Sequence, residues 1–446
     1  TQLWEVILKD PGIRSHCTQL APDLSTKETI MTLHPFAHNT FISWKTLAGV
    51  FALLVLVSSS ASAQAPPGVT PLKINSAVLG EERTILVRVP PGYETNKLRY
   101  PVLYMTDGNA HIGHTSSTVE FLARNGRMSE MIVVGITNTD RTRDLSPTHV
   151  TTTVSGGNSA LQFPTSGGAD KFLKFIETEL IPEIEKRYRV HPYRILAGHS
   201  LGGLFTIHTM MSRPELFHSY VAVSPALHWD NQVAVKRAED FFKARKEFPV
   251  TLFMSLGREP GPIEDGFYQL KQILEKNQTK DFEWKAQVLE DEDHGSVVMP
   301  SHYLALRKVF DGWQIPRDPN SGGVAGDFKS VEAHYQKLSK KFKYDIPVPE
   351  PLINQMGYQS LFADRFDEAI AIFKTNVERY PDSANVYDSL AEAYETTGKL
   401  ELAAPLYEKA QTLGQQNQDP NLAIYKTNFE RVSAKLKEAG AAKKNQ

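Results

Sequence analysis

Hydrophobic and polar residues follow two patterns along the middle of the chain. Between residues 72 and 317, short apolar runs rich in β-branched residues alternate with longer stretches in which apolar residues recur every three to four positions. The short runs predict buried strands and the longer stretches predict helices. We expect strands over 84–89, 101–105, 131–136, 195–197, 220–223, 250–255 and 286–289, and helices near 116–126, 169–188, 200–211, 231–245, 264–276 and 301–313. This alternation predicts an α/β fold, with a mostly parallel sheet covered by helices on both faces.

The pattern changes near residue 316. PRDPNSGG and DIPVPEP mark a linker over 317–350, which includes a short helical pattern over 331–342. From 351 to 440 the pattern is helical and repeats at a shift of 34 residues, which pairs Gly357 with Ala391, Ala369 with Ala403, Phe373 with Tyr407 and Asn376 with Ala410. This spacing resembles the tetratricopeptide repeat. About two repeats are too few for an independent solenoid, so we expect the segment to pack on the rest of the chain, to self-associate or to bind a protein partner.

The N-terminal region has the layout of a secretory signal peptide. The apolar run over 47–57 follows Lys45 and precedes SSSASAQA, in which Ala63 offers a small-residue cleavage site. The run is too short for the roughly 20 residues of a membrane-spanning helix. We therefore expect residues 1–63 to be upstream sequence and signal peptide with a start at Met31, and the mature chain to be secreted or periplasmic without a stable membrane span.

Composition narrows the function further. The chain has 49 Lys+Arg and 51 Asp+Glu, which gives a net charge of −2. It therefore lacks the excess of positive charge that would indicate a nucleic acid partner. Its single cysteine, Cys17, excludes an intramolecular disulfide and a Cys-rich metal site. His111 and His114 have no neighbouring carboxylate motif such as H-E-x-x-H. We expect neither a metal nor another cofactor.

A nucleophile motif lies in the centre of the α/β region. Residues 194–204 read RILAGHSLGGL, which is G-x-S-x-G between a predicted strand and a predicted helix. Glycines on both sides let the backbone turn sharply and expose the hydroxyl of Ser200 at a helix N-terminus. Ser200 is therefore the predicted nucleophile.

A serine nucleophile needs a base and a group that orients the base. In this architecture the chain order is Ser, acid, His. His294, in EDEDHGS after the last predicted strand, is the predicted base, whereas His302 falls on the next helix and is expected at the surface. The acid should follow the 250–255 strand, and Glu259 is our choice; Glu264, Asp265 and a dyad without an acid remain open.

The oxyanion of the reaction requires backbone N–H donors that are fixed before charge develops. One is the amide of Leu201, directly after the nucleophile. The second is expected after the 101–105 strand, where Gly108 permits a tight turn that aims the amide of Asn109 at the site. Asp107 is interpreted as a structural residue.

Four stretches identify a family: YPVLYMTDGNAH, GGADKFLKFIETELIPEIEKRYRV, AGHSLGGLFTIHTMMSRPELFHSYVAVSPALHWD and EDEDHGSV. They span most of residues 75–313 and resemble the esterase family of α/β-hydrolases, which includes esterase D, the antigen 85 mycolyltransferases, feruloyl esterases and the enterochelin and bacillibactin siderophore esterases. The resemblance implies an α/β-hydrolase domain over 64–316, Ser200 and His294 as nucleophile and base, and Leu201 and Asn109 as oxyanion donors. The acid does not carry over cleanly, because this chain has GREPG where relatives place it.

The function implied is a serine carboxylic ester hydrolase that cleaves a small-molecule ester through an acyl-enzyme, with siderophore esters or related acyl esters as substrates. Acyl transfer to an alcohol or sugar is an alternative, and so is a protein-interaction scaffold that uses the helical repeats. Arg141 and Arg143 are candidate substrate-binding residues, suited to bidentate contacts with an anionic group, or else residues of a loop held by its own ion pairs. Trp229 is a candidate wall of the acyl pocket, with core packing as the alternative.

Overall fold

The computed structural model describes residues 66–150, 163–320 and 322–444. Contacts divide the chain into two units, Thr1–Gln64 and Ala65–Gln446, and the second contains every described residue. Residues 1–65 lie outside the described residues, and they include Cys17. The expected signal peptide, its cleavage site and the expected start at Met31 therefore remain predictions.

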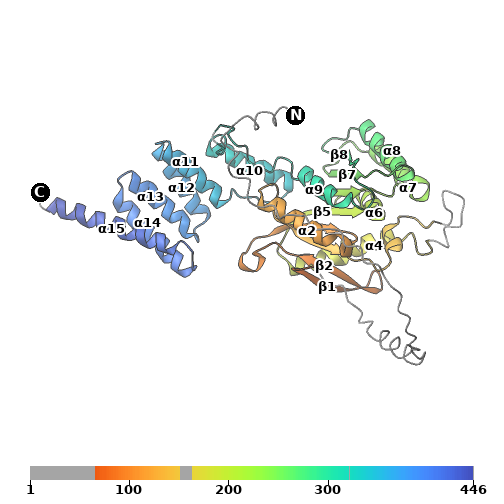
Figure 1. Ribbon diagram of the computed structural model, residues 1–446, viewed down its shortest axis with the longest axis horizontal. Helices are drawn as coiled ribbons and strands as arrows, with labels where there is room; N and C mark the ends of the chain where they lie inside the picture. The colour runs from red at the N-terminus through yellow and green to blue at the C-terminus, as the bar shows by residue number, and fades with distance from the viewer. Residues whose placement is uncertain (1–65, 151–162, 321, 445–446) are drawn as a thin grey trace, which may run out of the picture. The chain divides into compact units, whose positions relative to one another are not determined.

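Eight strands form one sheet in the order β1-β2-β4-β3-β5-β6-β7-β8 (Figure 1). All pairs from β4 to β8 in this order are parallel, whereas β1 pairs with β2 and β2 with β4 in the antiparallel sense. This confirms the expected mostly parallel sheet. The strands are β1 Val69–Ser76, β2 Glu81–Arg88, β3 Tyr100–Met105, β4 Ile132–Ile136, β5 Val190–His199, β6 Ser219–Val223, β7 Thr251–Leu256 and β8 Glu283–Val288.

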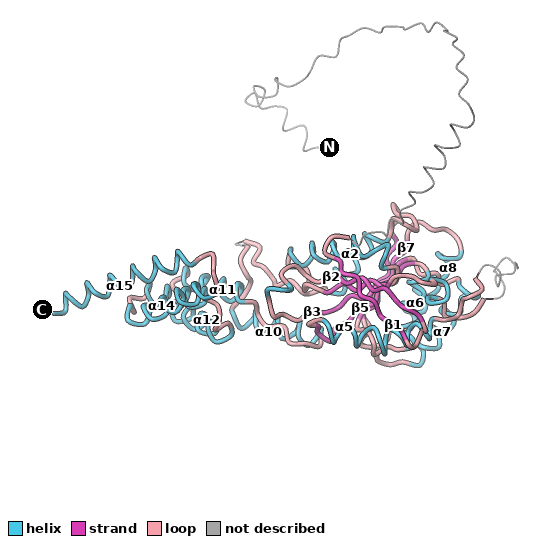
Figure 2. Tube along the Cα trace, turned by 90° about the horizontal axis from the view of Figure 1, so that it is seen from below, coloured by secondary structure: helices cyan, strands magenta, loops and turns pink. Residues whose placement is uncertain are grey.

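Helices cover both faces of the sheet, as the sequence predicts. Neighbouring residues of one strand enter different cores, because successive side chains of a strand point to opposite faces: Tyr104 belongs to one hydrophobic cluster and Leu103 to another. Helix α2 lies on one side of the strands and α5 and α7 lie on the other (Figure 2). The helices of this region are α2 Gly108–Arg124, α3 Arg141–Leu145, α4 Ala169–Phe175, α5 Ile181–Arg187, α6 Leu201–Ser212, α7 Trp229–Ala244, α8 Pro262–Lys276 and α9 Val298–Val309; a 3-10 turn covers Tyr93–Thr95, and the π-helical turn Ile176–Leu180 joins α4 to α5.

The parallel strands gather the candidate site at one edge. The carboxyl ends of parallel strands lie at the same edge of a sheet, and in open α/β folds ligands bind there. The segments that leave β3, β5, β6, β7 and β8 at this edge carry Asp107, Ser200, Ser224, Glu259 and His294 respectively.

The C-terminal region is entirely helical, which confirms the expected second segment. Helix α10 (Phe328–Phe342) packs on the α/β region, since the ring of Phe342 lies 4.9 Å from that of Phe310 and 5.0 Å from that of Tyr193. The helices α11 Glu350–Phe362, α12 Phe366–Arg379, α13 Ala384–Thr396, α14 Leu400–Gln416 and α15 Leu422–Lys444 follow. None of the helices among the described residues combines the length and apolar character needed to cross a bilayer.

The 34-residue spacing has a structural counterpart. A Cβ atom placed on Gly357 in α11 would lie 2.5 Å from the ring of Phe373 in α12, so a small residue is needed there. The shifted pair, Ala391 in α13 and Tyr407 in α14, is fully buried in the same cluster as Phe373. These contacts fit paired helices joined through small and aromatic residues; the tetratricopeptide assignment itself remains a prediction.

Candidate active site

Ser200 occupies a sharp turn between β5 and α6. Its backbone has φ 60° and ψ −116°, a conformation that a non-glycine residue adopts at a cost of about 1–3 kcal/mol. Backbone hydrogen bonds join the turn to the end of β6 and the residues after it, because Ser200 N–H donates to the oxygen of Val223 at 2.9 Å and the Ser200 carbonyl accepts from the amide of Ala226 at 3.0 Å. A Cβ atom on Gly198 would lie 2.1 Å from the Gly202 oxygen. Glycine is therefore required for the close approach within the turn.

Glu259 and His294 are paired at the same edge. The Glu259 Oε2 and His294 Nδ1 atoms lie 2.5 Å apart, and the Glu259 side chain is only 7% exposed. A carboxylate accepts hydrogen bonds, so Nδ1 is the donor and carries the proton of the neutral ring. Nε2 is then the nitrogen free to accept a proton, which is the tautomer a general base needs.

The second oxygen of Glu259 is also held. Ser224 Oγ donates to Glu259 Oε1 at 2.5 Å, and the amide of Gly257 donates to the same oxygen at 3.1 Å. Ser224 is fully buried and has a positive φ of 40°. Sequence reasoning did not single out Ser224, because no motif marks it.

His294, the predicted base, lies beside the turn that holds Ser200. The ring centroids of His294 and His199, the residue before Ser200, are 4.6 Å apart. Among the described residues, no hydrogen bond links the Ser200 hydroxyl to His294. Such contacts are often long until a substrate binds.

The other candidate acids do not reach the base. Glu264 and Asp265 lie in the first turn of α8, and neither forms a hydrogen bond or ion pair with His294 in the described part of the chain. Asp293 instead accepts the amides of Gly295 and Ser296, each at 2.8 Å, and so holds the turn around His294. Of the candidate acids Glu259, Glu264 and Asp265, the structure brings Glu259 to His294.

Two helix N-termini supply the predicted oxyanion donors. Asn109 lies in the first turn of α2, Leu201 lies in the first turn of α6, and neither amide donates to another described residue. A Cβ atom on Gly108 would lie 2.4 Å from the backbone carbon of Gly135, so only glycine permits this close approach. Free N–H groups at helix N-termini favour negative charge.

Arg141 bridges the oxyanion loop and the nucleophile turn. Its Nε and Nη2 donate to the Asp107 carboxylate at 2.6 and 3.1 Å, and Nη2 also donates to the carbonyl oxygen of His199 at 3.1 Å. Burial alone would raise the pKa of Asp107, but the ion pair with Arg141 and the Asn138 amide outweigh it and hold the pKa below its usual value.

Arg143 belongs to a second ion-pair network. It donates to Glu81 at 2.6 Å and to Asp144 at 2.8 Å, while the buried Arg83 lies 2.5 Å from Asp144. Hydrogen bonding by Arg143 lowers the pKa of Glu81, and Glu81 and Asp144 raise the pKa of Arg143. The geometry is that of a loop held by its own ion pairs; substrate binding by Arg141 and Arg143 stays a prediction.

Trp229 is anchored to the loop that follows α3. Its side chain is 7% exposed, its Nε1 donates to the Thr148 hydroxyl at 3.2 Å, and its ring centroid lies 5.3 Å from that of Phe163. The three residues that follow, Asp230–Gln232, all have positive φ. The described contacts are those of a buried packing residue, and its role as a pocket wall stays a prediction.

His302 is buried, so the expectation that it lies at the surface was wrong. The residue faces α2 rather than solvent, and its Nδ1 is 2.8 Å from Thr115 Oγ1. The ring centroids of His111 and His114 lie 6.4 and 5.7 Å from that of His302, and the ring of His199 lies 5.7 Å from that of His111. Burial lowers the pKa of His114 and of His199 to about 4. No group of three or more His, Cys, Asp or Glu within the described ranges could hold a metal ion.

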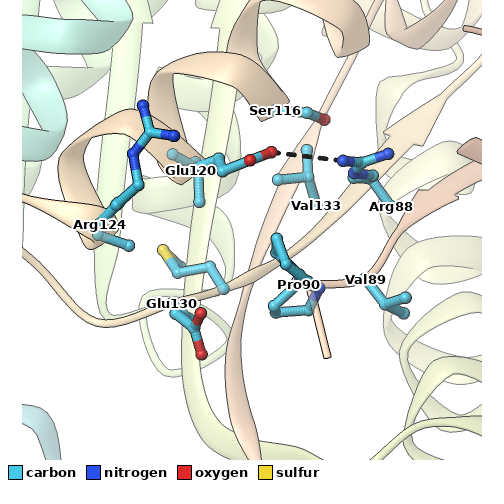
Figure 3. Close-up of a pocket in the computed structure, with 12 residues that line it drawn as sticks. Arg88, Val89, Pro90, Ser116, Glu120, Arg124, Glu130 and Val133 are labelled. Atoms are coloured by element: carbon cyan, nitrogen blue, oxygen red, sulfur yellow. Dashed lines mark hydrogen bonds and ion pairs between the residues drawn. The ribbon is translucent and has the colours of Figure 1, made fainter. Parts of the chain in front are cut away.

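A cavity of about 250 Å³ lies away from these residues. Figure 3 shows it between α2 and strands β2 and β4, with Arg88 and Glu120 joined by an ion pair of 3.3 Å across one side. Val89, Pro90 and Val133 supply apolar walls. Neither Ser200, Glu259 nor His294 lines this cavity, so it is not the mouth of the candidate site.

Comparison with known proteins places the α/β region in a family. The family model described as "Putative esterase" matches residues 76–292. The ferri-bacillibactin esterase BesA of Bacillus subtilis is 32% identical over 171 residues, which are 35% of this chain and 59% of that protein. The siderophore enterobactin esterase of Emericella nidulans is 30% identical over 238 residues, which are 45% of this chain and 78% of that protein.

Solved structures show the same fold. An IroE-like serine hydrolase from Shewanella oneidensis aligns with a TM-score of 0.62 and 26% identity, covering 70% of this chain and 99% of that one. An uncharacterised protein from Capnocytophaga ochracea aligns with a TM-score of 0.60 and 17% identity, covering 82% of this chain and 99% of that one. The second likeness concerns the fold alone.

Proposed function

Because this chain belongs to the esterase family and its relatives include siderophore esterases, we propose that it is a serine esterase that forms an acyl-enzyme on Ser200. The observation that carries the proposal is the 2.5 Å contact between Glu259 and His294, at the edge of the sheet where Ser200 is presented in a strained turn. The Glu259–His294 pair, Ser200 and the unbonded amides of Leu201 and Asn109 lie at the same edge, which supports acyl transfer as the chemistry of the site.

The chemistry follows from these positions. His294 Nε2 takes the proton of the Ser200 hydroxyl as the serine oxygen attacks the ester carbonyl carbon. The negative charge that develops on the carbonyl oxygen is stabilised by the amides of Leu201 and Asn109. His294 then returns the proton to the departing alcohol, and water, activated by the same histidine, releases the acid from Ser200.

The experiment that tests this function compares the parent protein with Ser200→Ala on a short p-nitrophenyl ester. We expect hydrolysis by the parent and a loss of at least about 10³-fold in kcat for the variant, because removal of a nucleophile leaves only binding and oxyanion stabilisation. A fluorophosphonate probe should label Ser200 in the folded parent. Equal rates of hydrolysis in both proteins would contradict the assignment of Ser200 as the nucleophile.

Names of relatives suggest the kind of substrate. Two of them are called esterases of bacillibactin and enterobactin siderophores. The match covers 59% of the first of these proteins. We propose that the substrate is a small-molecule acyl ester, such as a siderophore ester or a related compound. A panel of siderophore, feruloyl, acetyl-sugar and simple acyl esters tests this proposal.

We also propose that the chain is exported. The apolar run over 47–57, preceded by Lys45 and followed by a small-residue tract, supports this proposal. Expression of residues 31–446 in a bacterium, followed by N-terminal sequencing of the periplasmic fraction, should give a chain that begins at Gln64. Retention of the intact chain in the cytoplasm would contradict it.

The C-terminal helices have a proposed role in association. Two helix pairs are fewer than an independent solenoid needs, so we propose that they bind a protein partner or a second copy of the chain. Sedimentation of the full chain at several concentrations distinguishes the two cases. A mass that rises with concentration indicates self-association, whereas a constant monomer mass favours a different protein partner.

A further inference from the structure

The cavity in Figure 3 lies at the opposite edge of the sheet from the candidate active site. Strand β2 is antiparallel to β4, and Arg88, the last residue of β2, pairs with Val133 near the start of β4. The cavity lies between these two strand ends and α2. The segments that carry Ser200 and His294 leave the opposite ends of the parallel strands. A molecule in the cavity would therefore be separate from an ester held at Ser200.

The walls and the size of the cavity fit a single ring. Most of the walls are apolar, and they come from Pro90, Pro91, Val119, Ala123, Met131 and Val133. The volume of about 250 Å³ exceeds the roughly 150 Å³ of an engineered cavity that binds benzene. The thioether of Met131 can contact the edge of an aromatic ring, which is a favourable interaction. The cavity thus has room for one aromatic ring with a substituent.

One hydroxyl group at the cavity has no partner. Helix α2 contains four consecutive hydroxyl side chains, and those of Thr115, Ser117 and Thr118 each donate to the carbonyl oxygen four residues earlier, at 2.8 to 3.1 Å. This is the usual local bond of serine and threonine in a helix. Ser116 lines the cavity, but its buried hydroxyl forms no hydrogen bond with any described residue. Because an unpaired buried hydroxyl is destabilising, a ligand that bonds to it would be favoured.

The charged groups at the cavity balance one another. Arg88 and Glu120 form an ion pair of 3.3 Å. Arg124 and Glu130 are exposed residues of the lining with opposite charges, and neither forms an ion pair within the described part of the chain. A charged ligand would lose hydration here without meeting a net opposite charge. The cavity therefore favours a neutral ligand.

We propose that this cavity is a second binding site, which takes a neutral single-ring aromatic compound whose hydroxyl group bonds to the Ser116 hydroxyl. Figure 3 shows Ser116 beside the Arg88–Glu120 pair, with Val133 and Pro90 on the other side of that pair. The cavity thus has one polar end and one apolar end, as a phenol has. The proposal goes beyond the proposed esterase function and does not depend on it.

The test measures binding of para-fluorophenol and para-fluorotoluene by fluorine NMR. The two compounds have nearly the same shape, and only the first has a hydroxyl group. We expect saturable binding of para-fluorophenol with a Kd of about 0.1–1 mM, which is reasonable for a ligand of this size. Ser116→Ala should weaken that binding by about two- to tenfold, because one hydrogen bond is lost. The affinity for para-fluorotoluene should stay the same or rise.

Ser117→Ala is the matched control. The Ser117 hydroxyl donates to the carbonyl oxygen of Gly113 at 3.1 Å, and Ser117 does not line the cavity. This variant should bind both compounds as the parent does. Ser116→Ala removes only an unpaired hydroxyl, so its thermal midpoint should equal or exceed that of the parent.

Ala123→Leu locates the binding site, because the larger side chain would fill part of the cavity. It should weaken the binding of both compounds, and circular dichroism checks that the variant is folded. The proposal is overturned if para-fluorophenol shows no saturable binding, if Ser116→Ala binds it as tightly as the parent, or if folded Ala123→Leu does so. Tighter binding of para-fluorobenzoate than of para-fluorophenol would overturn the preference for a neutral ligand.

Discussion

Ser224 lies outside any motif, yet it holds the carboxylate that is paired with the proposed base, His294. Its hydroxyl and the Gly257 amide both donate to Glu259 Oε1, while Oε2 receives Nδ1–H of His294. The carboxylate is thus fixed at both oxygens. Its orientation in turn fixes the ring of the base.

We predict that Ser224→Ala lowers kcat about tenfold with little change in KM, because a hydrogen bond to a charged group contributes about 1.5–3 kcal/mol. The substitution keeps the Cβ atom, so the strain at φ 40° is unchanged. Steady-state kinetics with a p-nitrophenyl ester measure both constants.

Ser255→Ala is the matched control. Ser255 is also fully buried, but its hydroxyl has no hydrogen-bond partner among the described residues. We expect near-parental kcat from this variant. A similar fall in kcat for both variants would show that Ser224 acts through general stability and not through Glu259.

The sequence predicted the candidate site residues more readily than the residues with which they form hydrogen bonds. Ser200 and His294 follow from local motifs and chain order, and the choice of Glu259 over Glu264 rested on its place directly after a strand. The bonds from Arg141 to Asp107 and from Arg143 to Glu81 join residues 34 and 62 positions apart. No local pattern contains such contacts, because they depend on how the strands are ordered in the sheet.

Helices α2 and α9 meet through histidines, and this interface should be sensitive to acid. Burial holds the pKa of His302 well below 6.5 and lowers that of His114 to about 4. At these two histidines, whose pKa in the unfolded chain is near 6.5, the unfolded state binds more protons than the folded state between about pH 6.5 and pH 4. The contribution of these neutral histidines to stability is therefore complete above about pH 6.5 and is lost as the pH falls through that window.

We predict that the thermal midpoint drops as the pH is lowered from about 7 to about 4.5. His302→Gln, which has no group that titrates in this range, should give a shallower dependence. Circular dichroism at several pH values measures both slopes. Identical slopes in the parent and the variant would count against a role for this interface.

Gly357 limits how closely α11 and α12 can pack. A Cβ atom there would lie 2.5 Å from the ring of Phe373, which is fully buried and has little freedom to move. We predict that Gly357→Ala destabilises the helical segment by about 1–2 kcal/mol, since overpacking of about 1–3 kcal/mol is partly offset by the higher helix propensity of alanine.

The control for this prediction is Gly440→Ala in α15, where no atom lies within 4 Å of the added Cβ. That change should be neutral or slightly stabilising, because only the propensity gain of up to about 1 kcal/mol remains. Urea unfolding followed by circular dichroism compares the two. Stabilisation by both substitutions would contradict the close contact.

Elements with strong patterns were predicted well, and those with mixed patterns were not. Strands β3, β4, β6 and β7 are apolar runs buried along their whole length. Strand β1 was missed because VTPLKINS contains a proline and polar residues, as suits an antiparallel edge strand with exposed positions. Helix α2 begins at Gly108, earlier than expected, because GNAHIGH reads locally as a loop.

On the scale of the whole molecule, α10 attaches the C-terminal helices to the α/β region. Phe342 is fully buried, with its ring 4.9 Å from that of Phe310 and 5.4 Å from that of Trp313. We predict that Phe342→Ala costs about 3–5 kcal/mol at this junction and increases cleavage by trypsin between residues 317 and 350.

Phe362→Ala provides the comparison, since Phe362 in α11 is 79% exposed and little packing is lost with it. Limited proteolysis followed by mass spectrometry locates the cleavage sites. Equal cleavage of both variants and the parent would show that the junction does not depend on Phe342. The linker composition predicted a boundary here, but composition alone did not reveal that the helix inside the linker is a packed part of the fold.

The strained backbone at Ser200 also has an evolutionary consequence. Glycine adopts the φ of 60° found there without the steric cost that serine bears. A duplicated copy of this gene, once released from selection for catalysis, would gain stability by replacing Ser200, the proposed nucleophile, with glycine. Under the proposed function, only selection for catalysis would keep serine at position 200, because glycine there would stabilise the fold.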